Sequence, residues 1–109
     1  MKNLSKSRYT TFWQCSKALW LSIYKPEEAV VDAFTQARFE AVNYIGDLAM
    51  GYLGPYEEVT VHKADGSLDL AAMLSATKDA IARGVENIAE ASFSWDGNYC
   101  AVDILHKTP

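Results

Sequence analysis

The chain has 109 residues, a net charge of -4 and a hydrophobic fraction of 50%, which suits one globular domain, 1–109. Cys15 and Cys100 lie far apart without CxxC spacing, which excludes a disulfide framework and a self-contained zinc site. We therefore expect a reducing, cytoplasmic setting. No apolar run reaches the roughly 18 residues of a membrane helix, and no apolar segment typical of a signal peptide follows the basic N-terminus. We expect no membrane association.

Charge is distributed unevenly along the chain. The first 25 residues contain no acid, whereas the rest contains all 14 acidic residues. Within 1–25 the basic residues are Lys2, Lys6, Arg8, Lys17 and Lys25, interleaved with Tyr9, Phe12, Trp13, Trp20 and Tyr24. Cations bind phosphates and aromatic rings stack on bases, so Lys6, Arg8 and Lys17 are candidate nucleic-acid contacts. The alternative is an ordinary amphipathic helix with a solvated basic face.

Two helices are predicted in the first half of the chain. The first covers about 8–23, can be capped by Ser5 or Ser7, and ends at Lys25-Pro26 because the residue before proline avoids the α region. Its apolar residues recur every three or four positions, at Phe12, Cys15, Leu19 and Ile23. The second covers about 32–53 and stops at Gly54-Pro55. Its apolar line comprises Phe34, Ala37, Ala41, Ile45, Leu48 and Tyr52.

The second half of the chain alternates strands with one helix. A strand is predicted over 57–63, and a third helix over about 70–83, with Asp69 as its cap and Gly84 at its end. Strands over about 87–95 and 98–106 flank Asp96-Gly97, a strong hairpin signal. The pattern predicts an α/β protein of the α+β type, with about three helices on a small, mainly antiparallel sheet. The last strand leaves an open edge through which a homodimer could pair.

The hairpin register brings two acids together. With Asp96 and Gly97 as the loop, one face pairs Phe93 with Cys100, Ala91 with Val102, and Ala89 with Ile104. That apolar face is expected to pack on helices. The other face pairs Ser94 with Tyr99, Ser92 with Ala101, and Glu90 with Asp103.

Facing carboxylates are destabilising unless something relieves their repulsion. Relief can come from a bound cation, from a raised pKa on one acid, or from solvation. Asp103 also lies within the apolar run Val102–Leu105. Glu90 and Asp103 are therefore candidate metal ligands, and the alternative is a solvated or hydrogen-bonded structural pair.

The chain opens with LSKSRY at 4–9 and CSKALWL at 15–21, followed by the long helix 39–49 and the hairpin segments EASF (90–93) and VDIL (102–105). In this order the segments resemble the RecB-like PD-(D/E)XK nucleases, including their CRISPR-associated exonuclease branch. The opening is similar to that family's S-x-S and C-P-x-x-x-x-L pattern. Three departures stand out: Ser16 replaces a proline, Val42 replaces a glycine, and the long helix lacks a histidine.

The resemblance implies a partial restriction-endonuclease-like fold and metal-dependent DNA hydrolysis with Mg²⁺ or Mn²⁺. Asp103 matches the family's first metal-binding aspartate, and Glu90 would assist it as a catalytic and metal-binding residue. The family's acid-x-Lys motif does not follow within these 109 residues, so we expect a chain truncated before that motif and inactive by itself. Neither His62 nor His106 matches the family's ligand histidine.

Cys15 matches the early cysteine that binds an iron–sulfur cluster in the CRISPR-associated branch. The three further cysteines of that cluster are absent here, so we expect no cluster in this chain and a buried Cys15. Three functions stay open: a nuclease fragment acting on DNA, a non-catalytic nucleic-acid-binding module, and a small α/β protein-interaction domain.

Overall fold

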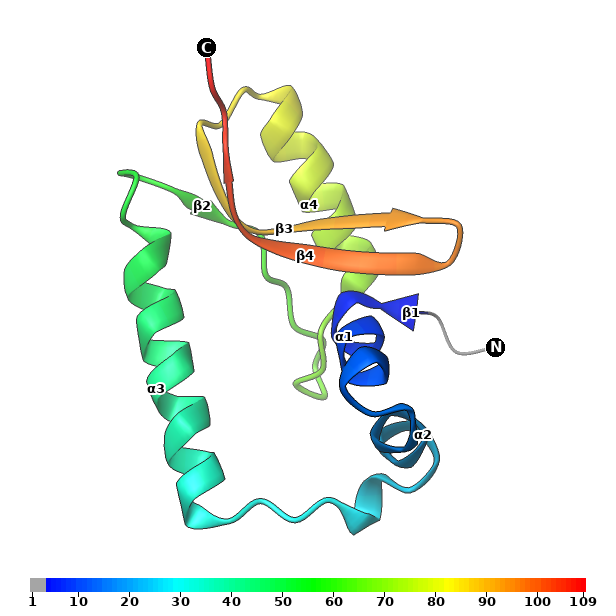
Figure 1. Ribbon diagram of the computed structural model, residues 1–109. Helices are drawn as coiled ribbons and strands as arrows, with labels where there is room; N and C mark the ends of the chain where they lie inside the picture. The colour runs from blue at the N-terminus through cyan, green and yellow to red at the C-terminus, as the bar shows by residue number, and fades with distance from the viewer. Residues whose placement is uncertain (1–3) are drawn as a thin grey trace.

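The computed structural model describes residues 4–109 and has the expected α+β architecture (Figure 1). Four α-helices accompany an open four-stranded sheet of order β1-β4-β3-β2. The elements in chain order are β1 (Leu4–Ser5), α1 (Lys6–Gln14), α2 (Ser16–Tyr24), the 3-10 helix η1 (Pro26–Glu28), α3 (Ala33–Met50), β2 (Glu57–Glu58), α4 (Leu70–Ala82), β3 (Asn87–Trp95) and β4 (Asn98–His106).

The β3–β4 hairpin is the centre of the sheet and matches the predicted bounds. Asp96 and Gly97 both have positive φ, 48° and 75°, as a two-residue type I′ turn requires. Most paired residues of the sheet belong to this antiparallel hairpin, as expected, and two short parallel pairings make the sheet mixed. The short β1 runs parallel to β4, and the short β2 runs parallel to β3.

The predicted boundaries of α3 and α4 follow from their caps. The Asp32 carboxylate accepts the Thr35 N–H at 2.7 Å, and the Asp69 carboxylate accepts the Ala72 N–H at 3.0 Å. Each satisfies one of the amide groups that a helix start leaves without a partner. Gly84 follows α4 with φ 77°. The end of α3 comes earlier than predicted, at Met50.

The bounds predicted for the first helix and the first strand are wrong. The single helix over 8–23 is divided into α1 and α2, because Cys15 adopts an extended backbone between them. The strand over 57–63 is reduced to β2. The following residues form a turn, in which the Lys63 N–H donates to the Ser67 carbonyl and the Asp65 carboxylate accepts the Ser67 N–H.

The buried core lies between α4 and the β3–β4 hairpin. Its buried residues are Val59, Ala80, Ile88 and Ala91, and Ala76, Val85, Val102 and Leu105 pack against them. The predicted alternation of faces is wrong here, because Ile88 and Ala91 share this cluster although they are three positions apart. Glu90 lies between them with φ 58°. Its left-handed backbone changes which residues of β3 face α4.

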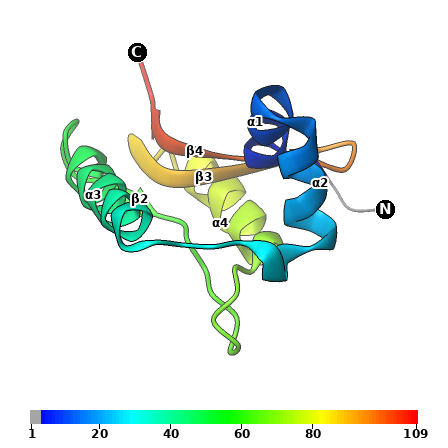
Figure 2. The same ribbon diagram turned by 60° about the horizontal axis from the view of Figure 1, so that its bottom comes forward.

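Outside this core the molecule is open. Figure 1 shows most of α3 lying away from the sheet, with its C-terminal end nearest to β2, and it is joined to α2 through η1 and an extended segment (Figure 2). The apolar line predicted for this helix is largely exposed, with Phe34 at 72%, Ile45 at 63% and Leu48 at 61%. No helix within residues 4–109 has the length and apolar character to cross a membrane.

A buried polar connection joins α4 to β3. The Thr77 hydroxyl donates to the Met73 carbonyl at 2.9 Å and accepts the Ser92 N–H at 2.9 Å. Thr77 and Ser92 are each only 2% exposed. The hydroxyl therefore satisfies a buried amide of β3 just beyond Glu90.

Replacing Thr77 with valine is expected to destabilise the fold by about 1–3 kcal/mol, because the buried Ser92 N–H loses its acceptor. Thr77→Ser keeps the hydroxyl and is the control. Amide hydrogen exchange at Ser92 distinguishes the two variants, since it should accelerate strongly only in the valine variant. Equal protection of Ser92 in both variants would show that this hydrogen bond is not what holds the amide.

Candidate functional site: an acidic pocket beside the hairpin

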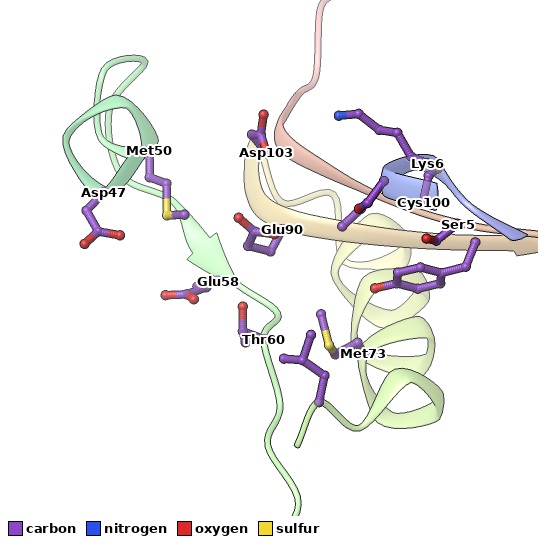
Figure 3. Close-up of a pocket in the computed structure, with 14 residues that line it drawn as sticks. Ser5, Lys6, Asp47, Met50, Glu58, Thr60, Met73, Glu90, Cys100 and Asp103 are labelled. Carbon is purple, nitrogen blue, oxygen red and sulfur yellow. The ribbon is translucent and has the colours of Figure 1, made fainter. Parts of the chain in front are cut away.

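A cavity of about 500 Å³ opens between α3, β2, the hairpin and the start of α1. Four carboxylates from four elements line it: Asp47 of α3, Glu58 of β2, Glu90 of β3 and Asp103 of β4. Figure 3 shows these side chains around one space, with Lys6 at its α1 side. Lys6 is the only basic residue among the described residues that line the cavity. We call this cavity the acidic pocket.

The hairpin has the predicted register on both sides of Glu90 and Asp103, but these two residues do not pair in the ladder as expected. Their neighbours pair as expected on both sides, Ala89 with Ile104 and Ala91 with Val102. Glu90 itself leaves the ladder because of its positive φ. Asp103 is exposed despite its apolar neighbours in sequence, and Glu90 is half-buried. The hairpin therefore brings both predicted acids into the same pocket.

The backbone of Glu90 is held in an unfavourable conformation by its surroundings. A non-glycine residue at φ 58° costs on the order of 1–2 kcal/mol. The Ser92 hydroxyl donates to the Glu90 carbonyl at 3.1 Å and lies 2.9 Å from the Tyr99 hydroxyl. The Ser92 N–H is fixed by Thr77. Strain of this kind persists where neighbouring contacts over-determine it, often at functional sites.

Electrostatics within the pocket disfavour the charged form of Glu90. Burial raises the pKa of its carboxyl above the ordinary value, and the negative charges of Asp103 and Glu58 raise it further. The positive charge of Lys6 opposes these effects. A cation in the pocket would act in the same direction as Lys6, so the site favours binding of positive charge.

Two pocket acids, Glu58 and Asp47, were not predicted from the sequence. Glu57 forms hydrogen-bonded ion pairs with Arg83 after α4, and successive residues of a strand point to opposite faces. Glu58 is therefore directed to the pocket. Asp47 is brought there by the end of α3, and Figure 3 shows it facing the space beside Glu58.

The connection from α3 to β2 is anchored by one buried side chain. The Asn87 amide donates to the Leu53 carbonyl at 3.3 Å and to the Pro55 carbonyl at 3.0 Å. Its oxygen lies 2.7 Å from His106 Nδ1. His106 thus has a hydrogen-bond partner on the neighbouring strand β3. The sequence offers no local signal for this long-range arrangement.

The three predicted nucleic-acid contacts, Lys6, Arg8 and Lys17, do not lie at one common site. Lys6 lines the acidic pocket. Arg8 is half-buried on α1, and Lys17 is exposed on α2 and does not line the pocket. Lys2 lies outside the described residues.

The two cysteines also differ in their positions. The expectation that Cys15 is buried is wrong, because the break between α1 and α2 leaves it exposed. Cys100 is half-exposed and lines the acidic pocket. We also expected the whole apolar face of the hairpin, including Phe93 and Cys100, to pack on helices. This is wrong at Phe93, which is 37% exposed.

The donor chemistry of the pocket fits a weakly held hard cation. Mg²⁺ is commonly bound by one or two carboxylates, with water and phosphate oxygens completing its coordination. Within residues 4–109, no group of three histidine, cysteine, aspartate or glutamate side chains is arranged as a ready metal site. A cation in the acidic pocket would therefore need water or other oxygens besides the carboxylates to complete its coordination.

No protein-family model, curated protein or solved structure matches this chain.

The strain at Glu90 gives a stability prediction. Glu90→Gly is expected to stabilise the fold by about 1 kcal/mol, because glycine adopts positive φ freely and the repulsion from Asp103 and Glu58 is removed. Ser94→Gly, at an ordinary position of the same strand, should instead destabilise by about 0.5–1 kcal/mol. Urea unfolding at pH 7 measures both. A loss of stability in both variants would contradict strain at Glu90.

Proposed function

We propose that this chain carries the metal-binding and DNA-binding part of a RecB-like PD-(D/E)XK nuclease domain. The single observation that supports this best is the acidic pocket, where Asp103 and Glu90 are joined by two further acids and by Lys6. A strained backbone at Glu90 and its raised pKa add to this support. The order of sequence segments that resemble the family is a separate argument for the same function.

In this proposal Asp103 and Glu90 hold a Mg²⁺ or Mn²⁺ ion, with Glu58 close enough to influence the charge of Glu90. Such an ion neutralises charge on a phosphate and lowers the pKa of a water molecule. Lys6, which lines the pocket, would contact a phosphate of the bound strand. The Ser92, Tyr99 and Thr77 hydroxyls keep Glu90 in place.

We expect the 109-residue chain by itself to bind DNA without cleaving it. The acid and the lysine of the acid-x-Lys motif do not follow β4 in these residues, and the family uses them to complete metal coordination and to position water. Cleavage of DNA by the purified chain in Mn²⁺, abolished by Asp103→Ala, would overturn this part of the proposal.

The binding part is tested by fluorescence anisotropy of a labelled DNA strand at one salt concentration. Affinity should be at least about tenfold higher in Mn²⁺ than in EDTA, because the ion bridges carboxylates and phosphate. The Asp103→Asn variant should lose this difference. Glu86→Gln, which removes an exposed acid outside the pocket, should keep it. Equal affinity of the wild-type chain in Mn²⁺ and EDTA would contradict a cation-assisted site.

A second candidate function is a non-catalytic DNA-binding module. The exposed Lys17 and the exposed aromatic residues of α1 and α2, such as Trp13 at 71%, favour it. In that case, salt-sensitive binding in EDTA would depend on Lys6, Arg8 and Lys17 together. Replacing all three with glutamine would abolish it.

A third candidate is protein pairing at the open edge of β4. Within the described chain, β1 pairs only with Asn98 and Tyr99, so most of this edge has no neighbouring strand. An unpaired edge can accept a strand of a second copy. A salt-insensitive homodimer without DNA binding would favour this function.

A further inference from the structure

A second cavity, of about 530 Å³, lies where β1 and α1 meet the tip of the hairpin. Four aromatic residues line it, together with polar and small side chains. The four are Tyr9, Phe93, Trp95 and Tyr99, and the lining also includes Lys6 and Asn98. We call it the aromatic pocket.

We propose that the aromatic pocket binds an unpaired base of single-stranded DNA whose neighbouring phosphate lies at the acidic pocket. The inference rests on the proposed function and adds a binding site for a base, outside the acidic pocket. Base faces are covered by their neighbours in a duplex, so a pocket built of rings selects bases that are unpaired and unstacked.

The rings of the aromatic pocket are available to a ligand. Trp95 is 85% exposed, Tyr9 51% and Phe93 37%. Within the described chain, Phe93, Trp95 and Tyr99 stack on no other ring, and Tyr9 meets Trp13 only edge-on. Tyr99 is held in place through its hydroxyl by Ser92. Stacking on such rings is tolerant of base identity because every base has a π face.

Charge and polarity at the pocket also suit a nucleotide. Among residues 4–109, Lys6 is the only charged one that lines it, so the local charge is positive although the chain as a whole is negative. A lysine beside a ring-lined cavity complements a base with its phosphate. Ser94 and Asn98 place side chains there that can donate to and accept from base edges.

The aromatic pocket and the acidic pocket adjoin each other. They share Ser5, Lys6, Tyr99 and Cys100. A strand with one base among the rings therefore has its backbone directed past Lys6 toward Glu90 and Asp103. Because it adjoins the acidic pocket, the aromatic pocket differs from other exposed apolar surface, such as the outer face of α3.

The test compares two fluorescein-labelled probes of equal length in EDTA, an oligothymidine of roughly ten nucleotides and a tract of abasic sites with the same phosphates. Anisotropy titrations should give roughly tenfold tighter binding of oligothymidine, the scale of one stacked base. Trp95→Ala should remove this preference. Trp20→Ala, whose ring packs against Tyr24 on α2 away from both pockets, should retain it.

Lys6→Gln should weaken both probes alike and reduce the salt dependence by about one phosphate contact. Equal affinity for the two probes, or equal effects of the two tryptophan variants, would overturn the base site. So would a dimer in sedimentation that Trp95→Ala dissociates, because the pocket would then be occupied by a second copy.

The probes are titrated in EDTA, so this test of the base site does not depend on the proposed metal site. If oligothymidine is preferred in EDTA but Mn²⁺ has no effect, the base site stands and the metal site fails. If Mn²⁺ increases affinity equally for both probes and neither is preferred in EDTA, the metal site stands and the base site fails.

Discussion

Replacing Ile88 with alanine is expected to destabilise the fold by about 3 kcal/mol. Ile88 is 2% exposed and belongs to the cluster that joins α4 to the hairpin. Because the buried core is small and much of α1–α3 is exposed, few other contacts can compensate. Domains are typically stable by only about 5–15 kcal/mol, so this change removes a large share of the total.

Equilibrium urea unfolding followed by circular dichroism measures the loss at Ile88. Ile45→Ala on α3 is the matched control, because Ile45 is the same residue type but 63% exposed. It should change stability by no more than about 0.5 kcal/mol. Similar losses in the two variants would show that α3 contributes to the core as much as β3 does.

Replacing Asp103 with asparagine is expected to weaken Mn²⁺ binding by at least about tenfold, since the amide keeps the shape but loses the charge. Asp103 is exposed, so the substitution should leave the fold intact. Calorimetric titration measures the affinity. The Glu86→Gln variant should bind Mn²⁺ as the wild-type chain does, and an equal loss in that variant would indicate general charge attraction rather than a site.

The pH dependence of Mn²⁺ binding follows from Glu90. Burial, Asp103 and Glu58 raise the pKa of this carboxyl, so protons compete with the ion at a higher pH than at an ordinary glutamate. As pH falls from 7, affinity should begin to drop before ordinary carboxylates are protonated. The same raised pKa means that the folded chain gains stability as pH falls through that window. Glu90→Gln should remove this gain.

Local sequence signals predicted the elements whose geometry is set by nearby residues. Asp96-Gly97 supplied both positive φ values of the hairpin turn, and the strand bounds and register followed. Asp69 and Gly84 marked the ends of α4 because capping is a local interaction. The same register predicted that Glu90 and Asp103 lie close together, and both line the acidic pocket.

Features that depend on distant contacts were not predictable in this way. The positive φ of Glu90 occurs beside long-range hydrogen bonds of Ser92 with Thr77 and Tyr99, and it changed the expected faces of β3. Glu58 and Asp47 enter the pocket through the parallel pairing of β2 and the position of α3. Periodicity likewise predicted an apolar line on α3, but it could not show that this line would be exposed.

An anomalous difference map from crystals of the chain soaked in Mn²⁺ would locate the proposed ion itself. We expect a peak in the acidic pocket beside the carboxylates of Glu90 and Asp103, and no such peak in crystals of the Asp103→Asn variant. Peaks confined to other acidic residues, or a peak in the pocket that persists unchanged in the variant, would contradict the proposed metal site.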